Sequence, residues 1–176
     1  MFFTNLETER LILKNIGNDD KDFIFSEFSN ENVTKYLYDA EPLTDMADAD
    51  EIISLYMEPE PRNQHRWIII NKKENIKMGT CGFHKWNKDE SKADIGYDLK
   101  KEFRKNGYMQ EALNEIIKFA KIKMKLKELN ACIFMDNTNS IKLAEKFGFI
   151  LNGTYNEIFS GKEYLHNIYT LFLNKM

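Results

Sequence analysis

The alternation of hydrophobic and polar residues divides the chain into strand-like and helix-like segments. Short apolar or alternating runs predict strands at 10–16, 66–70, 77–84, 92–99, 129–136, 149–156 and 164–173. Apolar residues repeated at intervals of three and four predict helices at 18–29, from 44 or 45 to the prolines at 59 and 61, at 107–124, and from 137 to the glycine at 148. The pattern therefore predicts an α+β fold with six to seven strands and about four helices.

The order of these segments indicates how the strands pair. The strands at 66–70, 77–84 and 92–99 follow one another through short polar turns, which is typical of an antiparallel meander. A helix separates the 92–99 strand from the 129–136 strand, and a right-handed crossover would make these two strands parallel. We therefore expect a mixed, mostly antiparallel sheet that covers one domain, residues 1–176.

Composition and charge limit the classes of function. Of the 176 residues, 43% are hydrophobic and 30% are charged, and the net charge is −3. This balance predicts a folded chain with no overall positive field to attract nucleic acid or an anionic membrane. No apolar run reaches the length that spans a bilayer, and the first residues lack the pattern of a signal peptide. We expect a cytoplasmic protein.

The cysteines and histidines are too scattered to suggest a metal site. Cys81 and Cys132 stand alone in the sequence, with no CxxC spacing and no cluster with the three histidines. This arrangement argues against zinc and against a disulfide framework. We expect reduced thiols and no metal.

A polar turn with one glycine precedes the long helix at 107–124. The free N–H groups and the positive dipole end of a helix N-terminus suit a phosphate or pyrophosphate. Arg104 and Lys105 would add charge, and Gly107 would allow close approach of the backbone. An ordinary connection with solvated side chains explains the same residues equally well, and neither GxGxxG nor GxxxxGK[ST] occurs in the chain.

A second polar turn, at Asn137, follows the 129–136 strand and opens the next helix. The Asn137 amide could close this turn or donate to a ligand between the strand ends. Helix capping by Asn137, Asn139 or Ser140 is the simpler explanation.

Motifs spread over nearly the whole chain resemble one family. They are "TERLILKNI", "NVTKYL", "RWIII", "ADIGYDL", "RKNGYMQEAL", "DNTNSIKLAEKFGF" and "YLHNIYTL", in this order. The chain resembles the GNAT acetyltransferase superfamily, in particular its branch of ribosomal-protein N-terminal acetyltransferases and small-amine acetylases. Three residues depart from the family pattern: Met109 replaces a small residue in the acetyl-CoA loop, Lys125 a helix-stop glycine, and His166 an aspartate.

The resemblance implies the GNAT fold, in which the two central parallel strands splay apart and acetyl-CoA binds between them. It implies that the pyrophosphate binds the loop formed by Arg104, Lys105, Asn106, Gly107, Tyr108 and Met109. The edge of the 92–99 strand, at Ile95, Tyr97 and Leu99, would pair with the pantetheine arm. Asn137 and Ser140 would also contact the coenzyme.

The same resemblance implies direct acetyl transfer to a primary amine in a ternary complex, without a metal. Such a reaction needs a base for the amine and an acid for the leaving thiolate. Ser140 is the first candidate acid, with Tyr155 and Tyr164 as alternatives. Asp94 is the first candidate base, and the alternatives are Glu157, Glu163 and His84.

The acceptor implied by the branch is a protein N-terminal amine. A polyamine, an amino acid or an antibiotic is an alternative acceptor, and a module that binds acetyl-CoA without turnover is an alternative class of protein. The segments at about 30–45, 84–91 and 156–164 would line the acceptor side. We expect a monomer or a homodimer.

Overall fold

The computed structural model describes residues 2–37 and 41–175. Over these residues the chain forms one eight-stranded sheet in the order β1-β2-β3-β4-β5-β6-β8-β7. The strands are β1 Leu6–Glu7, β2 Leu11–Asn15, β3 His65–Asn71, β4 Ile76–Asn87, β5 Lys92–Leu99, β6 Glu128–Phe134, β7 Ile150–Phe159 and β8 Lys162–Phe172. The helices are α1 Lys21–Phe28, α2 Glu31–Thr34, α3 Met46–Met57, α4 Tyr108–Ile122 and α5 Thr138–Lys146. Three short 3₁₀ turns are η1 Asn18–Asp20, η2 Lys101–Phe103 and η3 Leu173–Lys175.

The predicted mixed, mostly antiparallel sheet is confirmed. Seven strands and four helices match predicted segments, and the structure adds β1 and α2. These two elements span two and four residues, which is too short for hydrophobic periodicity to be detected. The strand expected at 77–84 extends to Asn87, so His84 lies inside β4 and not at its end.

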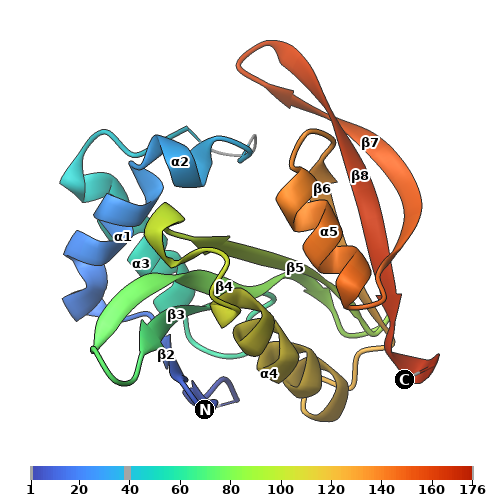
Figure 1. The fold of residues 1–176 in the computed structure, drawn as a ribbon, viewed down its shortest axis with the longest axis horizontal. Coiled ribbons are helices and arrows are strands. Elements are labelled where there is room, and N and C mark those ends of the chain that lie inside the picture. The colour runs from blue at the N-terminus through green and yellow to red at the C-terminus, as the bar shows by residue number, and fades with distance from the viewer. Residues whose placement is uncertain (1, 38–40, 176) are drawn as a thin grey trace.

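The helices cover the two faces of the β2–β5 part of the sheet. Helices α1, α2 and α3 lie on one side and α4 on the other, while α5 lies beside β6 (Figure 1). Successive side chains of β3 point to opposite faces of the sheet and so contribute to both cores. Ile68 and Ile70 pack with α1 and α3, whereas Trp67 and Ile69 belong to the core that includes α4.

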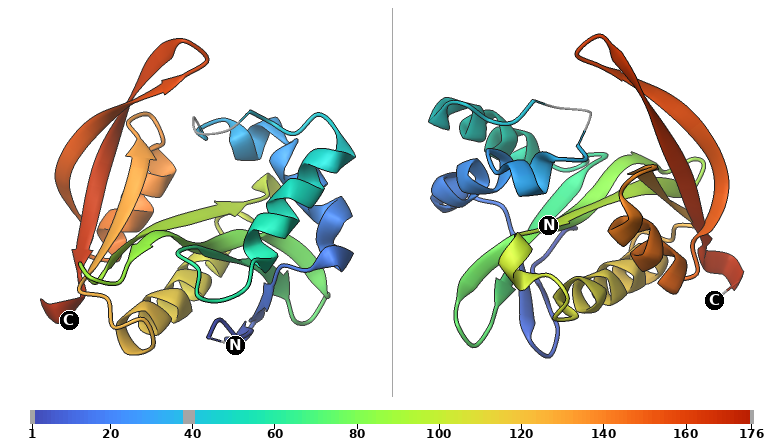
Figure 2. Two further views of the ribbon diagram at one scale, coloured as in Figure 1. Left: turned by 180° about the vertical axis from the view of Figure 1, so that it is seen from behind. Right: turned by 45° about the horizontal axis from the view of Figure 1, so that its top comes forward.

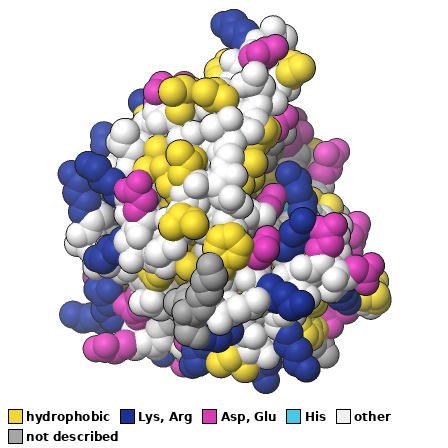
Figure 3. Space-filling model, turned by 90° about the vertical axis from the view of Figure 1, so that its right-hand side faces the viewer, with side chains coloured by type: hydrophobic (Ala, Val, Ile, Leu, Met, Phe, Trp, Pro, Cys, Tyr) yellow, Lys and Arg dark blue, Asp and Glu magenta, His cyan; other side chains and the backbone are white. Residues whose placement is uncertain are grey.

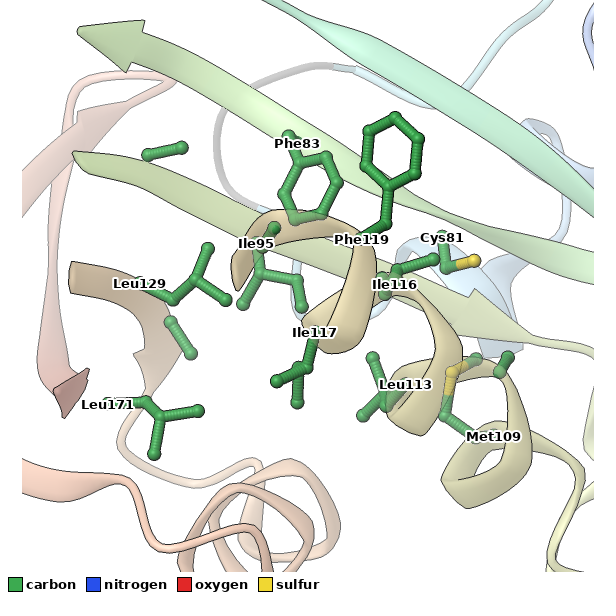
Figure 4. Packing of buried hydrophobic residues seen from close by; sticks show 14 of the residues in the cluster. Cys81, Phe83, Ile95, Met109, Leu113, Ile116, Ile117, Phe119, Leu129 and Leu171 are labelled. Carbon is green, nitrogen blue, oxygen red and sulfur yellow. The ribbon is translucent and has the colours of Figure 1, made fainter. Parts of the chain in front are cut away.

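The apolar stripe of α4 anchors this helix to the sheet. Its buried residues Leu113, Ile116 and Ile117 lie in one core with Phe83 and Ile95 of the strands (Figure 4). The helix ends at Ile122, two residues before the expected end at Met124. The chain then turns at Lys125, whose φ of 55° lies in the left-handed region.

The strands β5 and β6 separate soon after they pair. Their parallel register joins Lys92 with Glu128, Ala93 with Leu129 and Asp94 with Asn130, and it goes no further. Beyond Asp94, β5 continues to Leu99 without β6, while β6 stays paired with β8. The two views in Figure 2 show the sheet opening into a V at this point. The expected splay between the central parallel strands is therefore present.

The β7–β8 hairpin forms one arm of the V and the edge of the sheet. Figure 3 views the molecule from this side and shows apolar side chains spread among charged ones. Ile150, Leu151 and Ile158 of β7 are exposed there. The register of the hairpin shifts between Leu151 and Gly153. Such a bulge twists an edge strand and makes it a poor template for further pairing.

Candidate active site

A cavity of about 560 Å³ lies where β5 and β6 diverge. Its walls come from β3, β4 and β5, from α1 and α3, from β6 and the first turn of α5, and from the β7–β8 hairpin. Segments on the predicted acceptor side contribute Tyr36, Leu37, Glu41 and Leu43 to the lining. Residues 38–40 of the predicted 30–45 segment lie outside the described residues. The cavity thus joins the predicted coenzyme edge with the predicted acceptor walls.

Asp94 stands at the origin of the splay. It is the last β5 residue that pairs with β6, and its side chain lines the cavity with 22% exposure. Lys85 Nζ lies 3.5 Å from Asp94 Oδ2, but the Lys85 side chain is 79% exposed. A cation this exposed interacts only weakly with its partner. The carboxylate therefore remains available to a group in the cavity.

The opposite side of the splay is formed by the start of α5. Asn137 is the N-cap of α5, and its Oδ1 accepts a hydrogen bond from the Ser140 backbone N–H at 3.3 Å. The capping explanation for Asn137 is therefore correct, although its side chain also lines the cavity. Tyr97 crosses from β5 and donates a hydrogen bond to the Ser140 carbonyl at 3.4 Å. Burial raises the pKa of Tyr97 to about 12.

Tyr155 and His166 form the hairpin wall of the cavity. Their rings stack with centroids 5.1 Å apart, and Glu157 lies on the same face of the ribbon. Cys132 of β6 lines the same cavity, close to Tyr155. Burial raises the pKa of the Cys132 thiol to about 11, so the thiol is neutral at physiological pH.

Two of the alternative catalytic candidates, Glu163 and Tyr164, lie away from the cavity. Glu163 pairs with Ile158 on the opposite face of the ribbon from Tyr155, and it accepts a hydrogen bond from Asn156. Tyr164 packs at the rim, with its ring 6.0 Å from that of Phe134. Neither side chain is part of the cavity lining.

His84 lines the cavity in a form that disfavours a role as base. Its Nε2 lies 3.3 Å from Nη2 of Arg66, which can only donate a hydrogen bond. Burial, together with the charge of Arg66, lowers the pKa of His84 to about 3. His84 is therefore neutral, with its proton on Nδ1 and its other nitrogen occupied.

The 104–109 loop lies outside the cavity lining, at the N-terminus of α4. Gly107 is the N-cap with a φ of 79°, a conformation that strongly favours glycine. Arg104 donates to the carbonyls of Leu99 and Asn32, each at 2.8 Å. The Arg104 guanidinium thus fixes the conformation of the loop. The first backbone N–H groups of a helix such as α4 have no hydrogen-bond partner within the helix.

The other predicted coenzyme residues divide into buried anchors and surface groups. Ile95, Leu99 and Met109 are buried in the core, so only their backbone atoms can face a ligand. Lys105 and Asn106 are exposed. Tyr108 lies under the Arg10 guanidinium and accepts a hydrogen bond from Asn71. Met109 thus fills a core position, which explains a large residue where the family pattern has a small one.

Sequence reasoning missed Arg66, Cys132 and Glu27. Arg66 lines the cavity and forms an ion pair with Asp98, and Glu27 is completely buried behind that pair. A charged residue inside a predicted apolar strand or helix face is the one signal that could have found Arg66 and Glu27. Cys132 had no such signal, because a single cysteine in a strand is usually part of the core.

No group of three or more His, Cys, Asp or Glu side chains suited to a metal ion occurs within residues 2–37 and 41–175. Among the helices of that same part of the chain, none is long and apolar enough to cross a membrane.

Comparison with known proteins places this geometry in a family. Residues 10–150 match the model of the acetyltransferase (GNAT) domain. The "Uncharacterized N-acetyltransferase YoaA" of Bacillus subtilis (strain 168) is 32% identical over 175 residues, which covers 96% of this chain and 97% of YoaA. A GNAT-family acetyltransferase from Bacillus anthracis superposes with a TM-score of 0.84 at 22% identity, over 97% of this chain and 99% of that one.

A further solved structure carries the coenzyme. Spermidine N-acetyltransferase from Vibrio cholerae, in complex with CoA and spermine, superposes with a TM-score of 0.83 at 17% identity, over 96% of this chain and 98% of that one. The free β5 edge, the open splay and the N-terminus of α4 fit such a coenzyme in this chain. The chain therefore belongs to the GNAT acetyltransferase family and is an acetyl-CoA-dependent N-acetyltransferase.

Proposed function

We propose that the cavity at the splay acetylates a primary amine, and that this amine is a protein N-terminus. The observation that carries the proposal is the loss of β5–β6 pairing after Asp94. It leaves a free strand edge inside a cavity large enough for the reacting groups and for the first residues of a peptide. An extended acyl arm can pair with such an edge as an added strand would.

The reaction follows from the residues around the edge. The amine nitrogen forms a bond with the thioester carbon while the carbon–sulfur bond breaks and leaves its electron pair on sulfur. Asp94 takes the proton that nitrogen loses, directly or through water, because it is a cavity carboxylate at the origin of the splay. Ser140 or Tyr155 returns a proton to sulfur, since both hydroxyl-bearing side chains line the same cavity.

The coenzyme pyrophosphate would bind outside the cavity, at the start of α4. There the residues from Lys105 to Met109 would present backbone N–H groups at the positive end of the helix dipole, while the Arg104 N–H donates to the Lys101 carbonyl. Lys105 is exposed and could contact phosphate oxygens, whereas the Asn106 side chain donates to the carbonyls of Phe103 and Arg104 and would contribute its backbone N–H. Ile95, Tyr97 and Leu99 would contribute backbone groups to the pantetheine arm. Asn137 would use its amide nitrogen, because its oxygen caps α5.

A second acceptor is favoured by the charge of the cavity walls. Glu41, Asp94 and Glu157 are acidic, and the rings of Tyr36 and Tyr155 lie in the same lining. Carboxylates and aromatic faces attract organic cations, so a polyamine is the alternative acceptor. We place the reaction in the cytoplasm, which fits the free thiols of Cys81 and Cys132.

An acceptor panel tests the proposal. Thiol release from acetyl-CoA would be measured with peptides of different N-terminal residues, with spermidine and with an aminoglycoside. We expect turnover with peptides to exceed that with the other amines. Higher turnover with spermidine would show that the acceptor is a polyamine and not a peptide. The absence of turnover with every amine would refute the proposed reaction.

Two pairs of variants test the assigned residues. Asp94→Asn should lower kcat by about 10²–10⁴-fold, the usual contribution of a general base, and Ser140→Ala should lower it less. Gly107→Val should weaken acetyl-CoA binding at least about tenfold in calorimetry, because φ is positive there. Gly161→Val is the control, since Gly161 also has a positive φ of 75° but lies at the hairpin tip. Equal coenzyme affinity in both glycine variants would refute the loop assignment.

A further inference from the structure

Arg66 presents a positive charge to the floor of the cavity. It is only 9% exposed, and its side chain lines the cavity beside Gly96 of β5. A β-carbon placed on Gly96 would lie 2.9 Å from Arg66 Nη2 and 3.0 Å from His84 Nε2. The guanidinium therefore rests directly on the strand whose free edge begins after Asp94. Glycine at position 96 leaves the space that the guanidinium fills.

Neighbouring side chains hold the guanidinium in this place. Nη1 donates to Asp98 Oδ2 at 3.1 Å, and Nη2 donates to His84 Nε2 at 3.3 Å. Asp98 is fixed in turn by Thr80, whose backbone N–H and hydroxyl both donate to the carboxylate. Asp98 is thus a positioning residue, and Arg66 cannot swing toward the carboxylates at the cavity rim.

The ion pair is oriented with its positive end toward the cavity. Arg66 is part of the cavity lining, whereas Asp98 lies behind it and is only 5% exposed at its side chain. Glu27 lies behind Asp98 with no exposed surface. Burial, together with the charge of Asp98, raises the pKa of Glu27 far above its ordinary value. Glu27 is consequently neutral near pH 7 and does not cancel the charge of Arg66.

We propose that Arg66 acts as a fixed positive charge at the reaction centre, which lowers the pKa of the bound acceptor amine and stabilises negative charge on the thioester oxygen. The inference rests on the proposed function of the cavity. An acceptor amine is mostly protonated at neutral pH, and only its neutral form can attack. A cation close to the amine favours the neutral form, and the low dielectric of a buried site strengthens this effect.

The other charged and titratable groups around Arg66 act differently. On β4, His84 is neutral and Lys85 is largely exposed. On β5, Asp94 faces the cavity and Asp98 holds the guanidinium. From the helix side, α1 contributes neutral Glu27, α3 contributes the Tyr56 ring near His84, and Lys100 lies 3.9 Å from Glu27. Arg66 is therefore the buried cation nearest to the free β5 edge among these groups.

The pH profile of kcat tests the inference, because kcat reports groups in the enzyme–substrate complex. It would be measured for the wild type, Arg66→Lys and Arg66→Met with the best acceptor of the panel. We expect Arg66→Met to raise the midpoint of the rising limb by about 1 pH unit or more and to lower kcat about 10- to 100-fold. Arg66→Lys keeps the positive charge, so its midpoint should lie close to that of the wild type. Acetyl-CoA affinity in calorimetry should change less than about twofold in both variants.

The matched control is Lys88→Met, which removes an exposed cation from the β4–β5 turn, outside the cavity lining. Solvent and salt screen that charge, so the midpoint should move by less than about 0.3 pH unit. If Arg66→Met does not fold, Gly96→Ala displaces the guanidinium without removing it, and it should move the midpoint in the same direction.

Three results overturn the inference. They are an unchanged midpoint in Arg66→Met or Gly96→Ala, an equal shift in Lys88→Met, and a failure of Arg66→Lys to restore the profile. A wild type that acetylates no amine would instead refute the proposed function, so the two failures are distinguishable.

Discussion

The two faces of the β3–β5 part of the sheet differ in chemistry: the face toward α4 is apolar, whereas the face toward α1 and α3 carries Ile68 and Ile70 together with a polar network. Toward α4, the strands present Trp67, Cys81 and Phe83, all fully buried among apolar side chains. Toward α1 and α3, the adjacent positions include Arg66 and Thr80, which belong to a hydrogen-bonded network at the cavity. The same strands thus hold an apolar core on one face and, on the other, a second core beside the cavity. The apolar face directly beneath the site therefore supplies its rigidity.

The largest effect should follow from Asp98→Asn on the polar face. This change leaves the 9% exposed Arg66 without its counter-charge, and breaking a buried pair costs about 3–5 kcal/mol of unfolding free energy. Urea denaturation measures the loss. Asp89→Asn, in an exposed turn, should change stability by less than about 0.5 kcal/mol. Equal stabilities of the two variants would mean that the Arg66–Asp98 pair contributes nothing to folding.

On the apolar face, Ile116→Ala should reduce the free energy of unfolding by about 3 kcal/mol. Ile116 is fully buried against the sheet, and truncation leaves a cavity. Ile122 on the same helix is 58% exposed, so Ile122→Ala should cost less than about 1 kcal/mol. The pH profile of acetyl transfer should stay unchanged in both variants. A shifted profile in Ile116→Ala would show that the two faces are not separable.

Glu27→Gln should change how stability depends on pH. The folded-state pKa of Glu27 is raised by burial and by Asp98, so its contribution is complete below the unfolded pKa and is lost as pH rises toward the folded pKa. The wild type should therefore lose up to about 1.4 kcal/mol per pH unit relative to Glu27→Gln between pH 6 and 8. Urea titrations at several pH values give this difference. Parallel curves would place the Glu27 pKa near its ordinary value.

The smallest effect should come from Lys125→Gly, just beyond α4. Lys125 has a φ of 55°, where glycine avoids the strain that a side chain causes. The substitution should raise stability by about 0.5–1 kcal/mol in urea denaturation. Lys123 has a φ of −90°, so Lys123→Gly should instead destabilise the chain by a similar amount. A loss in both variants would contradict the strain at position 125.

Local pattern was sufficient for most elements of the fold. The stripe of α4, the meander from β3 to β5 and the parallel crossover to β6 each follow from periodicity and order. The polar turn before α4 and the cap at Asn137 were also predictable, because turns and helix starts depend on nearby residues. The short elements β1 and α2 were not predictable, since they depend on pairing and packing with distant segments.

The mixed sheet, the glycine turn at the start of a long helix and the motifs of an acetyltransferase were all predictable from the order of the residues. Which side chains meet depends on the folded chain. Arg66, His84 and Gly96 come from three strands, and register alone brings them together. Glu27 became a neutral acid because α1 packs it behind Asp98. Desolvation and charge proximity act between residues distant in sequence, and so the state of the site depends on the folded chain.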